Sequence, residues 1–317
     1  MSDKFSLSAI IALAILATAT SCGHKEIVCP APEEINIVFE WDNAPHADIA
    51  GMALLFYPLD GNERIWRFDI AGKEGGQIKL PSGTYELISC NNDLPGIILG
   101  NTESPSTLSA SARCMETDKE TGVYASSGML YCGEISRLEV TPCGIRYTTA
   151  NGTIKECSRR IMRCKPDSVA TVYTVEFTHV DGIERIRSAV VELEGVRSSI
   201  LLETDRSSDI PATLAIEMDT DSGNGTICGS GCAFAPNNIL EAKYLVKLQI
   251  LLTNGKTVAR EIDIKPENLN IITPHNVLIT IDGIVIPEGD PSGDIGGIGA
   301  IVDGWEVIKI DLGPTIQ

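Results

Sequence analysis

Short runs of apolar residues, alternating with polar ones and bounded by Gly, Pro, Asn or Asp, extend along most of this chain and predict β-strands. In the first half these runs are Ile35–Trp41, Met52–Tyr57, Ile65–Ile70, Tyr85–Cys90, Gly128–Tyr131, Leu138–Thr141 and Ile145–Thr149. In the second half they are Val169–Phe177, Ser188–Leu193, Thr213–Met218, Thr226–Phe234, Tyr244–Leu252, Thr257–Ile264, Val277–Ile286 and Ile301–Ile310. Apart from an apolar run at the N-terminus, no long segment has the period of an amphipathic helix.

Three Asp-Gly or Asn-Gly pairs separate neighbouring runs and predict tight hairpins at Asp60-Gly61, Asn151-Gly152 and Asn254-Gly255. The segment Asn91–Thr121 is rich in Pro, Ser and Thr and is interpreted as a long excursion from the strands. We expect a short helical turn at Pro266–His275. Many short strands with Gly and Pro turns in each half of the chain indicate one β-sandwich per half.

The sequence therefore predicts an all-β protein with two β-sandwich domains in tandem, at 35–165 and 166–317, meeting near Lys165-Pro166. A dense basic cluster precedes this boundary, formed by Lys155, Arg159, Arg160, Arg163 and Lys165. A solvated strand edge or a linker explains such a cluster, because charged edges prevent sheets from aggregating. A docking surface for an acidic partner is the alternative interpretation.

The N-terminus has the pattern of a secretory signal. Lys4 precedes the apolar run Phe5–Ala19, and the small residues Thr20 and Ser21 lead to Cys22. The run is shorter than the roughly 20 apolar residues that span a bilayer. A cysteine after Ala19-Thr20-Ser21 resembles a bacterial lipobox, with Ala19 where the strict pattern has leucine. We expect a signal peptide at 1–21, lipidation of Cys22 and a polar tether at 22–34; an ordinary signal peptide or a signal anchor is the alternative.

Composition narrows the class of partner. The formal net charge is −18, from 25 basic and 43 acidic residues, so nucleic acid is not an expected ligand. Nine cysteines remain besides Cys22, and an odd number leaves at least one without a partner within the chain. Cys228 and Cys232 are four residues apart in a predicted strand, where they share one face, and buried small residues are the commoner explanation of such cysteines.

No motif in the sequence indicates catalysis, a cofactor or a bound metal. The four histidines, His24, His46, His179 and His275, are far apart and form no zinc motif. The segment from Asp219 to Gly225 superficially resembles a calcium loop, but its sixth residue is asparagine where an EF-hand has glycine. A hairpin turn explains the same residues, and we expect a protein without enzymatic activity.

Several structural motifs together resemble a known family. They are Val38-Phe39-Glu40-Trp41, Gly51-Met52, Phe56-Tyr57-Pro58 with Asp60-Gly61, Leu80–Tyr85, Asn91-Asn92-Asp93, Asn276–Ile286 and Val302–Trp305. The chain resembles an uncharacterised family of Bacteroidales lipoproteins that is similar to the fimbrillin superfamily, especially to its anchor and minor subunits. The resemblance implies two transthyretin-like β-sandwich domains in tandem. The major subunits of the superfamily assemble by strand addition after proteolysis removes an N-terminal strand. It also implies a lipid anchor in the outer membrane, with the protein facing the cell surface.

One local feature indicates which fimbrial role applies. No Lys or Arg lies between Lys25 and Arg64, so a trypsin-like maturation protease has no site near the first predicted strand, Ile35–Trp41. A chain that keeps this strand would anchor or terminate an assembly and would not extend it. A monomeric surface lipoprotein that never meets a fimbria fits the same residues.

Two further hypotheses concern other functions. A glycan-binding surface lipoprotein of a polysaccharide-uptake system would need exposed aromatic platforms, and the chain has three tryptophans. Trp41 and Trp305 lie in the family's strand motifs and are expected in the core. A hydrolase on a β-sandwich would require carboxylates clustered in a cleft.

Overall fold

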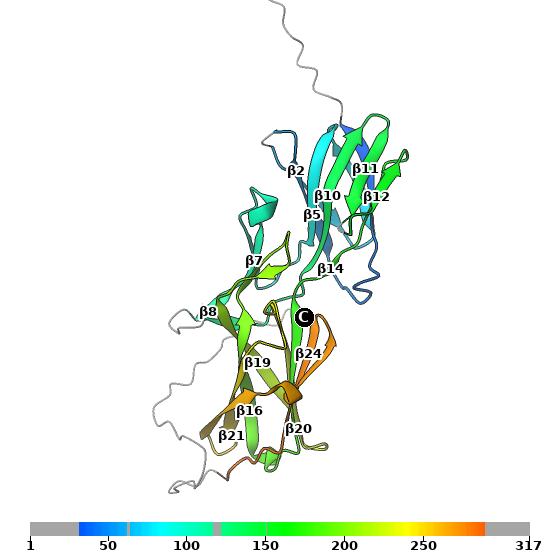
Figure 1. Cartoon of the computed structure of the whole chain (residues 1–317). Coiled ribbons are helices and arrows are strands. Elements are labelled where there is room, and N and C mark those ends of the chain that lie inside the picture. Colours follow the sequence, from blue (N-terminus) through cyan, green and yellow to red (C-terminus); the bar gives the residue numbers. More distant parts are fainter. Residues whose placement is uncertain (1–31, 62–63, 117–121, 150, 289–317) are drawn as a thin grey trace, which may run out of the picture.

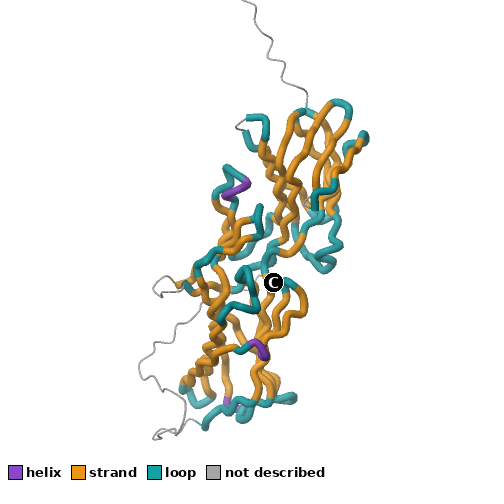
Figure 2. Tube along the Cα trace, in the orientation of Figure 1, coloured by secondary structure: helices purple, strands orange, loops and turns teal. Residues whose placement is uncertain are grey.

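The computed structural model describes residues 32–61, 64–116, 122–149 and 151–288. In these ranges the regular elements are strands, apart from three single-turn 3-10 helices. The strands form an elongated molecule with two stacks of sheets, one above the other (Figures 1 and 2). The all-β class is therefore confirmed. Within the described ranges we find no helix with the length and apolar character needed to cross a bilayer.

The N-terminal stack consists of a three-stranded sheet, in the order β13-β1-β4, and a seven-stranded sheet, in the order β12-β11-β10-β5-β2-β3 with β14 beside β10. Their inner faces enclose one apolar core that includes Ile35, Leu54 and Leu87. The strands are β1 (Glu33–Phe39), β2 (Gly51–Pro58), β3 (Trp66–Ala71), β4 (Gly75–Leu80), β5 (Gly83–Asn91), β10 (Tyr131–Thr141), β11 (Gly144–Thr149), β12 (Ile154–Cys157), β13 (Ile161–Cys164) and β14 (Asp167–Ser168).

The C-terminal stack is a ten-stranded sheet in the order β22-β21-β16-β19-β20-β15-β24-β23, with β8 and β9 attached at β19. The sheet folds over at β19 and β20, so that both layers enclose a second core that includes Tyr173, Leu193 and Val246. Its elements are β8 (Cys114–Glu116), β9 (Val123–Ala125), β15 (Thr171–Thr178), η2 (Ile183–Arg185), β16 (Ile186–Arg197), β19 (Pro211–Asp221), β20 (Thr226–Ala233), β21 (Tyr244–Leu252), β22 (Thr257–Ile264), η3 (Pro266–Asn268), β23 (Leu269–Thr273) and β24 (Asn276–Asp282).

A small sheet joins the two stacks. Its order is β18-β17-β7-β6, and it encloses a third apolar cluster with Leu55, Ile88 and Phe234. Its elements are β6 (Ile97–Gly100), η1 (Pro105–Thr107), β7 (Ser109–Ala112), β17 (Ser199–Leu201) and β18 (Arg206–Ser207). The segment 91–121, which we expected to be an excursion without strands, thus contributes β6, β7 and β8. These strands are short, and β7 pairs with β17, about ninety positions away, which local alternation does not reveal.

Apart from the short strands β14, β8 and β9, the first and last strands of each stack pair with each other in parallel. In the N-terminal stack Asn36 of β1 lies beside Ile161 of β13, and in the C-terminal stack Val172 of β15 lies beside Asn276 of β24. The opposite side of each first strand carries an antiparallel neighbour, β4 or β20. Both first strands are therefore interior members of their sheets.

Most expected turns and strands are confirmed. Gly61, Gly152 and Gly255 have φ near +80°, a backbone region that glycine adopts without a steric penalty, and each lies in the connection between two paired strands. Several expected boundaries differ from those of the structure, and two of the differences have a clear cause. Residues 128–130 are not in a strand, because Gly128 instead donates its N–H to the Pro95 carbonyl (2.8 Å), and β24 ends at Asp282, before Gly283 at φ +74°.

Segment 266–275 departs from the expected helical turn. Only its first three residues form a turn, η3, and the rest forms β23 along the edge of β24. Apolar and polar residues alternate only weakly in Leu269–Thr273, so this run forms a strand because it pairs with the edge of β24.

Candidate assembly surfaces

The first strand, β1, is fixed on both sides in the N-terminal stack. It pairs in parallel with β13 and antiparallel with β4, and Ile35, Ile37 and Phe39 on its inner face are at most 5% exposed. The described chain contains no Lys or Arg from residue 32 to residue 61. A protease specific for basic residues therefore has no target in β1 or in the loop 40–50 that follows it.

The basic cluster near residue 160 binds to the two ends of β1. Arg160 forms an ion pair with Glu33 (2.7 Å) before the strand's inner run, and Arg163 forms one with Glu40 (2.8 Å) just after its end. Lys165 pairs with Asp42 at 2.8 Å. Such exposed pairs contribute little individually, about 0–1 kcal/mol. Their placement nevertheless shows that much of this cluster balances acidic residues of the chain itself.

Trp41 lies where β1 gives way to the loop 40–50. Its ring is half-buried and meets Tyr131 edge-to-face at 5.7 Å, and its indole N–H donates to the Lys73 carbonyl (2.7 Å). The expected burial of Trp41 is thus met in part. Trp305 lies outside the described residues.

The aromatic side chains of the described ranges offer no exposed stacking platform. Tyrosine, phenylalanine and tryptophan are all buried or half-buried there, and the exposed large apolar residues are aliphatic or methionine. The guanidinium of Arg64 covers the half-buried Trp66 ring at 4.1 Å. This arrangement weakens the glycan-binding hypothesis.

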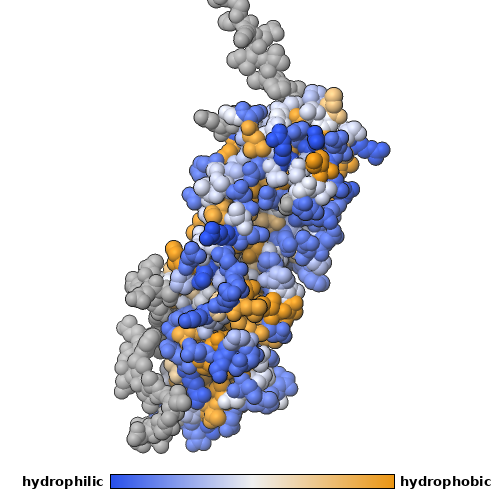
Figure 3. Space-filling model, viewed as in Figure 1, coloured by the Kyte–Doolittle hydropathy of each residue, from blue (hydrophilic) through white to orange (hydrophobic). Residues whose placement is uncertain are grey.

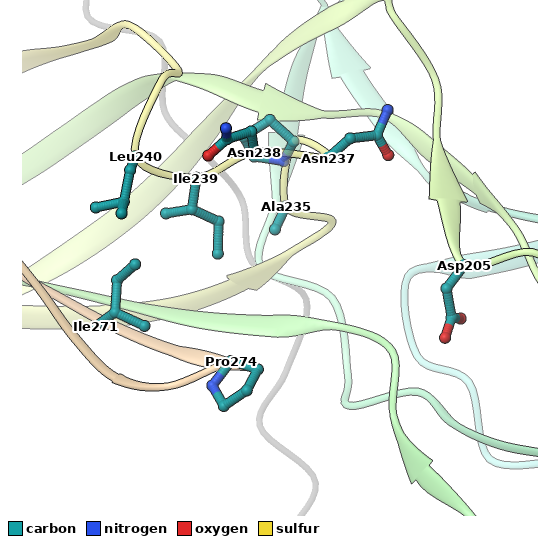
Figure 4. A pocket seen from close by; sticks show the side chains of 9 residues that line it. Asp205, Ala235, Asn237, Asn238, Ile239, Leu240, Ile271 and Pro274 are labelled. Carbon is teal, nitrogen blue, oxygen red and sulfur yellow. The ribbon is translucent and has the colours of Figure 1, made fainter. Parts of the chain in front are cut away.

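Among the described residues, the ten-stranded sheet of the C-terminal stack ends in two open edges, β22 and β23. Beside β23 lies a cavity of about 370 Å³, between this strand and the loop that joins β20 to β21. Figure 4 shows Ile271 of β23 near Ile239 and Leu240 of that loop, with Asp205 at the far end. In Figure 3 apolar residues also gather on the surface over the β23–β24 region. Sheet edges next to pockets that can take a side chain are suited to binding an added strand.

The calcium-like segment and the cysteine pair of β20 have structural explanations. Oδ1 of Asp221 accepts the backbone N–H of Gly223 (2.9 Å) in the tight turn between β19 and β20, which confirms the hairpin interpretation of the calcium-like segment. The described ranges contain no group of three potential metal-ligating side chains. Cys228 and Cys232 share the outward face of β20, half-buried, and none of the eight described cysteines is in a disulfide.

Two neighbouring glutamates, Glu86 and Glu134, have raised pKa values. Burial, with smaller contributions from the negative charges of Glu203 and Glu134, raises the pKa of Glu86 to about 7. Burial also raises the pKa of Glu134, which faces the same neighbour. These glutamates lie on the neighbouring strands β5 and β10 and interact with Glu203 of the loop after β17. We therefore regard them as a source of pH-dependent stability and do not interpret them as a catalytic pair.

The family of the chain follows from comparison with known proteins. The family described as "Domain of unknown function (DUF5119)" matches residues 21–217, more than half of the sequence. The chain belongs to this family.

The relatives of the chain include fimbrial and adhesin-like proteins. A protein from Bacteroides ovatus named "Putative fimbrium anchoring subunit Fim4B" is 27% identical over 103 residues, which cover 32% of this chain and 30% of that relative's length. The crystal structure of a "putative adhesin" from the same species superposes with a TM-score of 0.60 at 19% identity, covering 82% of this chain and 94% of the other. The fimbrial anchor protein Mfa2 from Porphyromonas gingivalis has a TM-score of 0.48 at 10% identity, covering 79% and 90%. The resemblance to fimbrillin-like proteins is confirmed.

The expected lipidation site, Cys22, lies outside the described residues, as do the signal peptide at 1–21 and most of the tether at 22–34.

Proposed function

We propose that this protein is a non-enzymatic, lipid-anchored protein of the cell surface that serves as the anchor or a minor subunit of a fimbria, or as a related adhesin. The main support is the first strand, β1. It is interior to its sheet, buried on its inner face and followed by a loop without a basic residue. A strand that maturation does not remove keeps its own groove filled, so no incoming strand replaces it. The curated relative named as a fimbrium anchoring subunit agrees with this role.

For the fold, we propose two transthyretin-like β-sandwich domains in tandem, at 35–165 and 166–317. Two separate apolar cores and the repeated parallel pairing of first and last strands support this division. Strands β7 and β9 belong to the N-terminal domain by sequence and pair with β17 and β19 of the C-terminal domain. That exchange would stiffen the junction, as an anchor under load requires.

For the location, we propose that the signal peptide is removed after Ser21 and that the new N-terminal Cys22 carries lipid. The protein would then be held in the outer membrane by its N-terminus, facing the cell surface. Since β1 begins at Glu33, the N-terminal stack would lie next to the membrane and the C-terminal stack away from it. The partner, another fimbrial or surface protein, would add a strand to the exposed edge β23 and place a side chain in the adjacent 370 Å³ cavity.

A protease experiment tests the anchoring role. The lipid-free protein is incubated with an Arg/Lys-specific protease, and its N-terminus and its size are measured. We expect β1 to be retained and the protein to stay out of polymers. Loss of β1 from the unaltered protein, with a ladder of oligomers, would show that it is a polymerising subunit.

A variant with a basic residue in the loop supplies the positive control. His46 is exposed in the loop after β1, so His46→Arg introduces a cleavage site without disturbing the core. We expect the protease to cut this variant after β1 while leaving His46→Gln intact at the same position. This pair establishes that the protease reaches the loop and that the missing basic residue is what preserves the strand.

A further inference from the structure

The outer edge of the C-terminal stack leaves core-facing side chains uncovered at β22. Ile262 and Val258 of β22 lie opposite Val246 and Ile250 of β21 in the sheet register, so they point to the same face, the core. Val246 and Ile250 are at most 2% exposed, whereas the β22 side chains are only half-buried. The core is therefore incomplete along β22.

The opposite layer of the stack, which ends in β23, also leaves core-facing side chains partly uncovered at its edge. Leu269 and Ile271 lie opposite Ile279 and Val277 of β24, which are fully buried. Leu269 is half-buried and Ile271 is 36% exposed. Since the ten-stranded sheet folds over at β19 and β20, its two ends, β22 and β23, lie on the same side of the core. We call the space between these two edges the open seam.

The described chain ends beside this seam. The side-chain amide of Asn254, in the turn that leads into β22, donates to the Glu288 carbonyl (3.3 Å). Arg260 of β22 donates to the Val285 carbonyl (3.2 Å). Arg185 donates to the Ile286 carbonyl (2.8 Å). These three bonds fix the exit point of the chain at the start of β22.

The sequence beyond the exit point contains one strand-like segment, Ile301–Ile310, with Ile308 and Ile310 on either side of Lys309. A spacer of twelve residues, 289–300, separates it from Glu288 and contains five glycines. Twelve extended residues reach about 40 Å. The eight residues of β22 span only about 26 Å, so the spacer permits either strand direction.

We propose that the segment 301–310 of this same chain adds to the free edge of β22 and covers the open seam. The face that carries Val302, Ile308 and Ile310 would complete the core. The backbone of the segment would pair with the edge amides that β22 otherwise presents to solvent. A segment tethered by a glycine-rich spacer of twelve residues has an effective concentration in the millimolar range, which favours it over a second copy of the protein at ordinary concentrations. The edge of β23 stays available, so this closure is compatible with a partner strand there.

Hydrogen exchange on the full lipid-free chain tests the proposal. The double variant Ile308→Asp/Ile310→Asp places charge on the apolar face, and Lys309→Asp, which changes the intervening residue, is the matched control. We expect amide exchange in β22 to accelerate by at least about tenfold in the double variant and to stay near that of the unaltered protein in the control. Slow exchange in β16 and β21 is measured alongside, because it shows that each variant has folded.

Several results would overturn the proposal. One is equal exchange in β22 for the double variant and the control. Another is fast edge exchange in the unaltered chain. A third is protection of β22 that appears only as protein concentration and measured mass rise together, which would assign the seam to a second copy. Protection that is independent of concentration, in a monomer by light scattering, supports closure within the chain.

Discussion

Ile35→Ala tests directly whether the first strand belongs to the stable core. Ile35 lies in β1, is fully buried, and faces Ile78 of β4, which is 4% exposed. The next residue, Asn36, points to the other face and is exposed. Asn36→Ala is therefore the matched control, since it alters the same strand without altering the core.

The expected cost of Ile35→Ala follows from its burial. The substitution removes three carbon atoms, and at about 0.8 kcal/mol for each buried methylene the lost transfer free energy is about 2.4 kcal/mol. Incomplete collapse of the resulting cavity adds to this, and comparable substitutions cost about 2–5 kcal/mol. We expect the free energy of unfolding of the N-terminal stack to fall by about 3 kcal/mol.

Urea unfolding followed by tryptophan fluorescence measures this loss. Trp41 and Trp66 both pack against the core that contains Ile35, so their emission follows the N-terminal stack. With a urea dependence of about 1–3 kcal/mol per molar, a loss of about 3 kcal/mol lowers the midpoint by roughly 1–3 M. A midpoint shift no larger than that of Asn36→Ala would refute the conclusion that β1 is a structural part of the mature protein.

Three further predictions concern the anchor, an acidic group and a turn. Cys22→Ala should leave the protein unprocessed or release it from membranes; membrane association together with a mature N-terminus lacking acyl chains would contradict lipidation. Folding raises the pKa of Glu86 from 4.5 to about 7, so its charge destabilises the fold increasingly as pH rises through that interval. Glu86→Gln should accordingly raise the melting temperature at pH 8 and change it little below pH 4.5, and an equal change at both pH values would argue against the shift. Gly255→Ala, at φ +85°, should cost about 1–2 kcal/mol in thermal unfolding, since only glycine adopts that conformation freely.

The sequence allowed accurate prediction where pairing is local. The bounds of β21 and β22 match the predicted runs Tyr244–Leu252 and Thr257–Ile264 residue for residue. The burial of successive side chains alternates along both strands. The turn at Asn254-Gly255 brings the strands into register without any distant partner. The local sequence was sufficient for β21 and β22 because the turn between them sets their register, and no distant strand is needed to align them.

Prediction failed where a strand depends on a distant neighbour. The run of β23, Leu269–Thr273, has little alternation and becomes a strand only because β24 offers it an edge. Ser109–Ala112, which forms β7, is short and weakly apolar, and it pairs with residues 199–201. For the same reason the sequence revealed the missing basic residues near β1 but not the open edges. Whether a strand is at an edge depends on strand order, which is a property of the whole sheet.

The repeated parallel pairing explains why retention of the first strand would determine the role of this protein. In each stack the first strand lies between an antiparallel and a parallel neighbour: β1 between β4 and β13, and β15 between β20 and β24. Removing β1 would open two edges at once and expose the three buried side chains of its inner face. At about 2–4 kcal/mol each, these side chains account for much of the 5–15 kcal/mol that typically stabilises a domain. The stack without β1 would therefore need an incoming strand to remain folded, whereas in the stack with β1 that position between β4 and β13 is already filled.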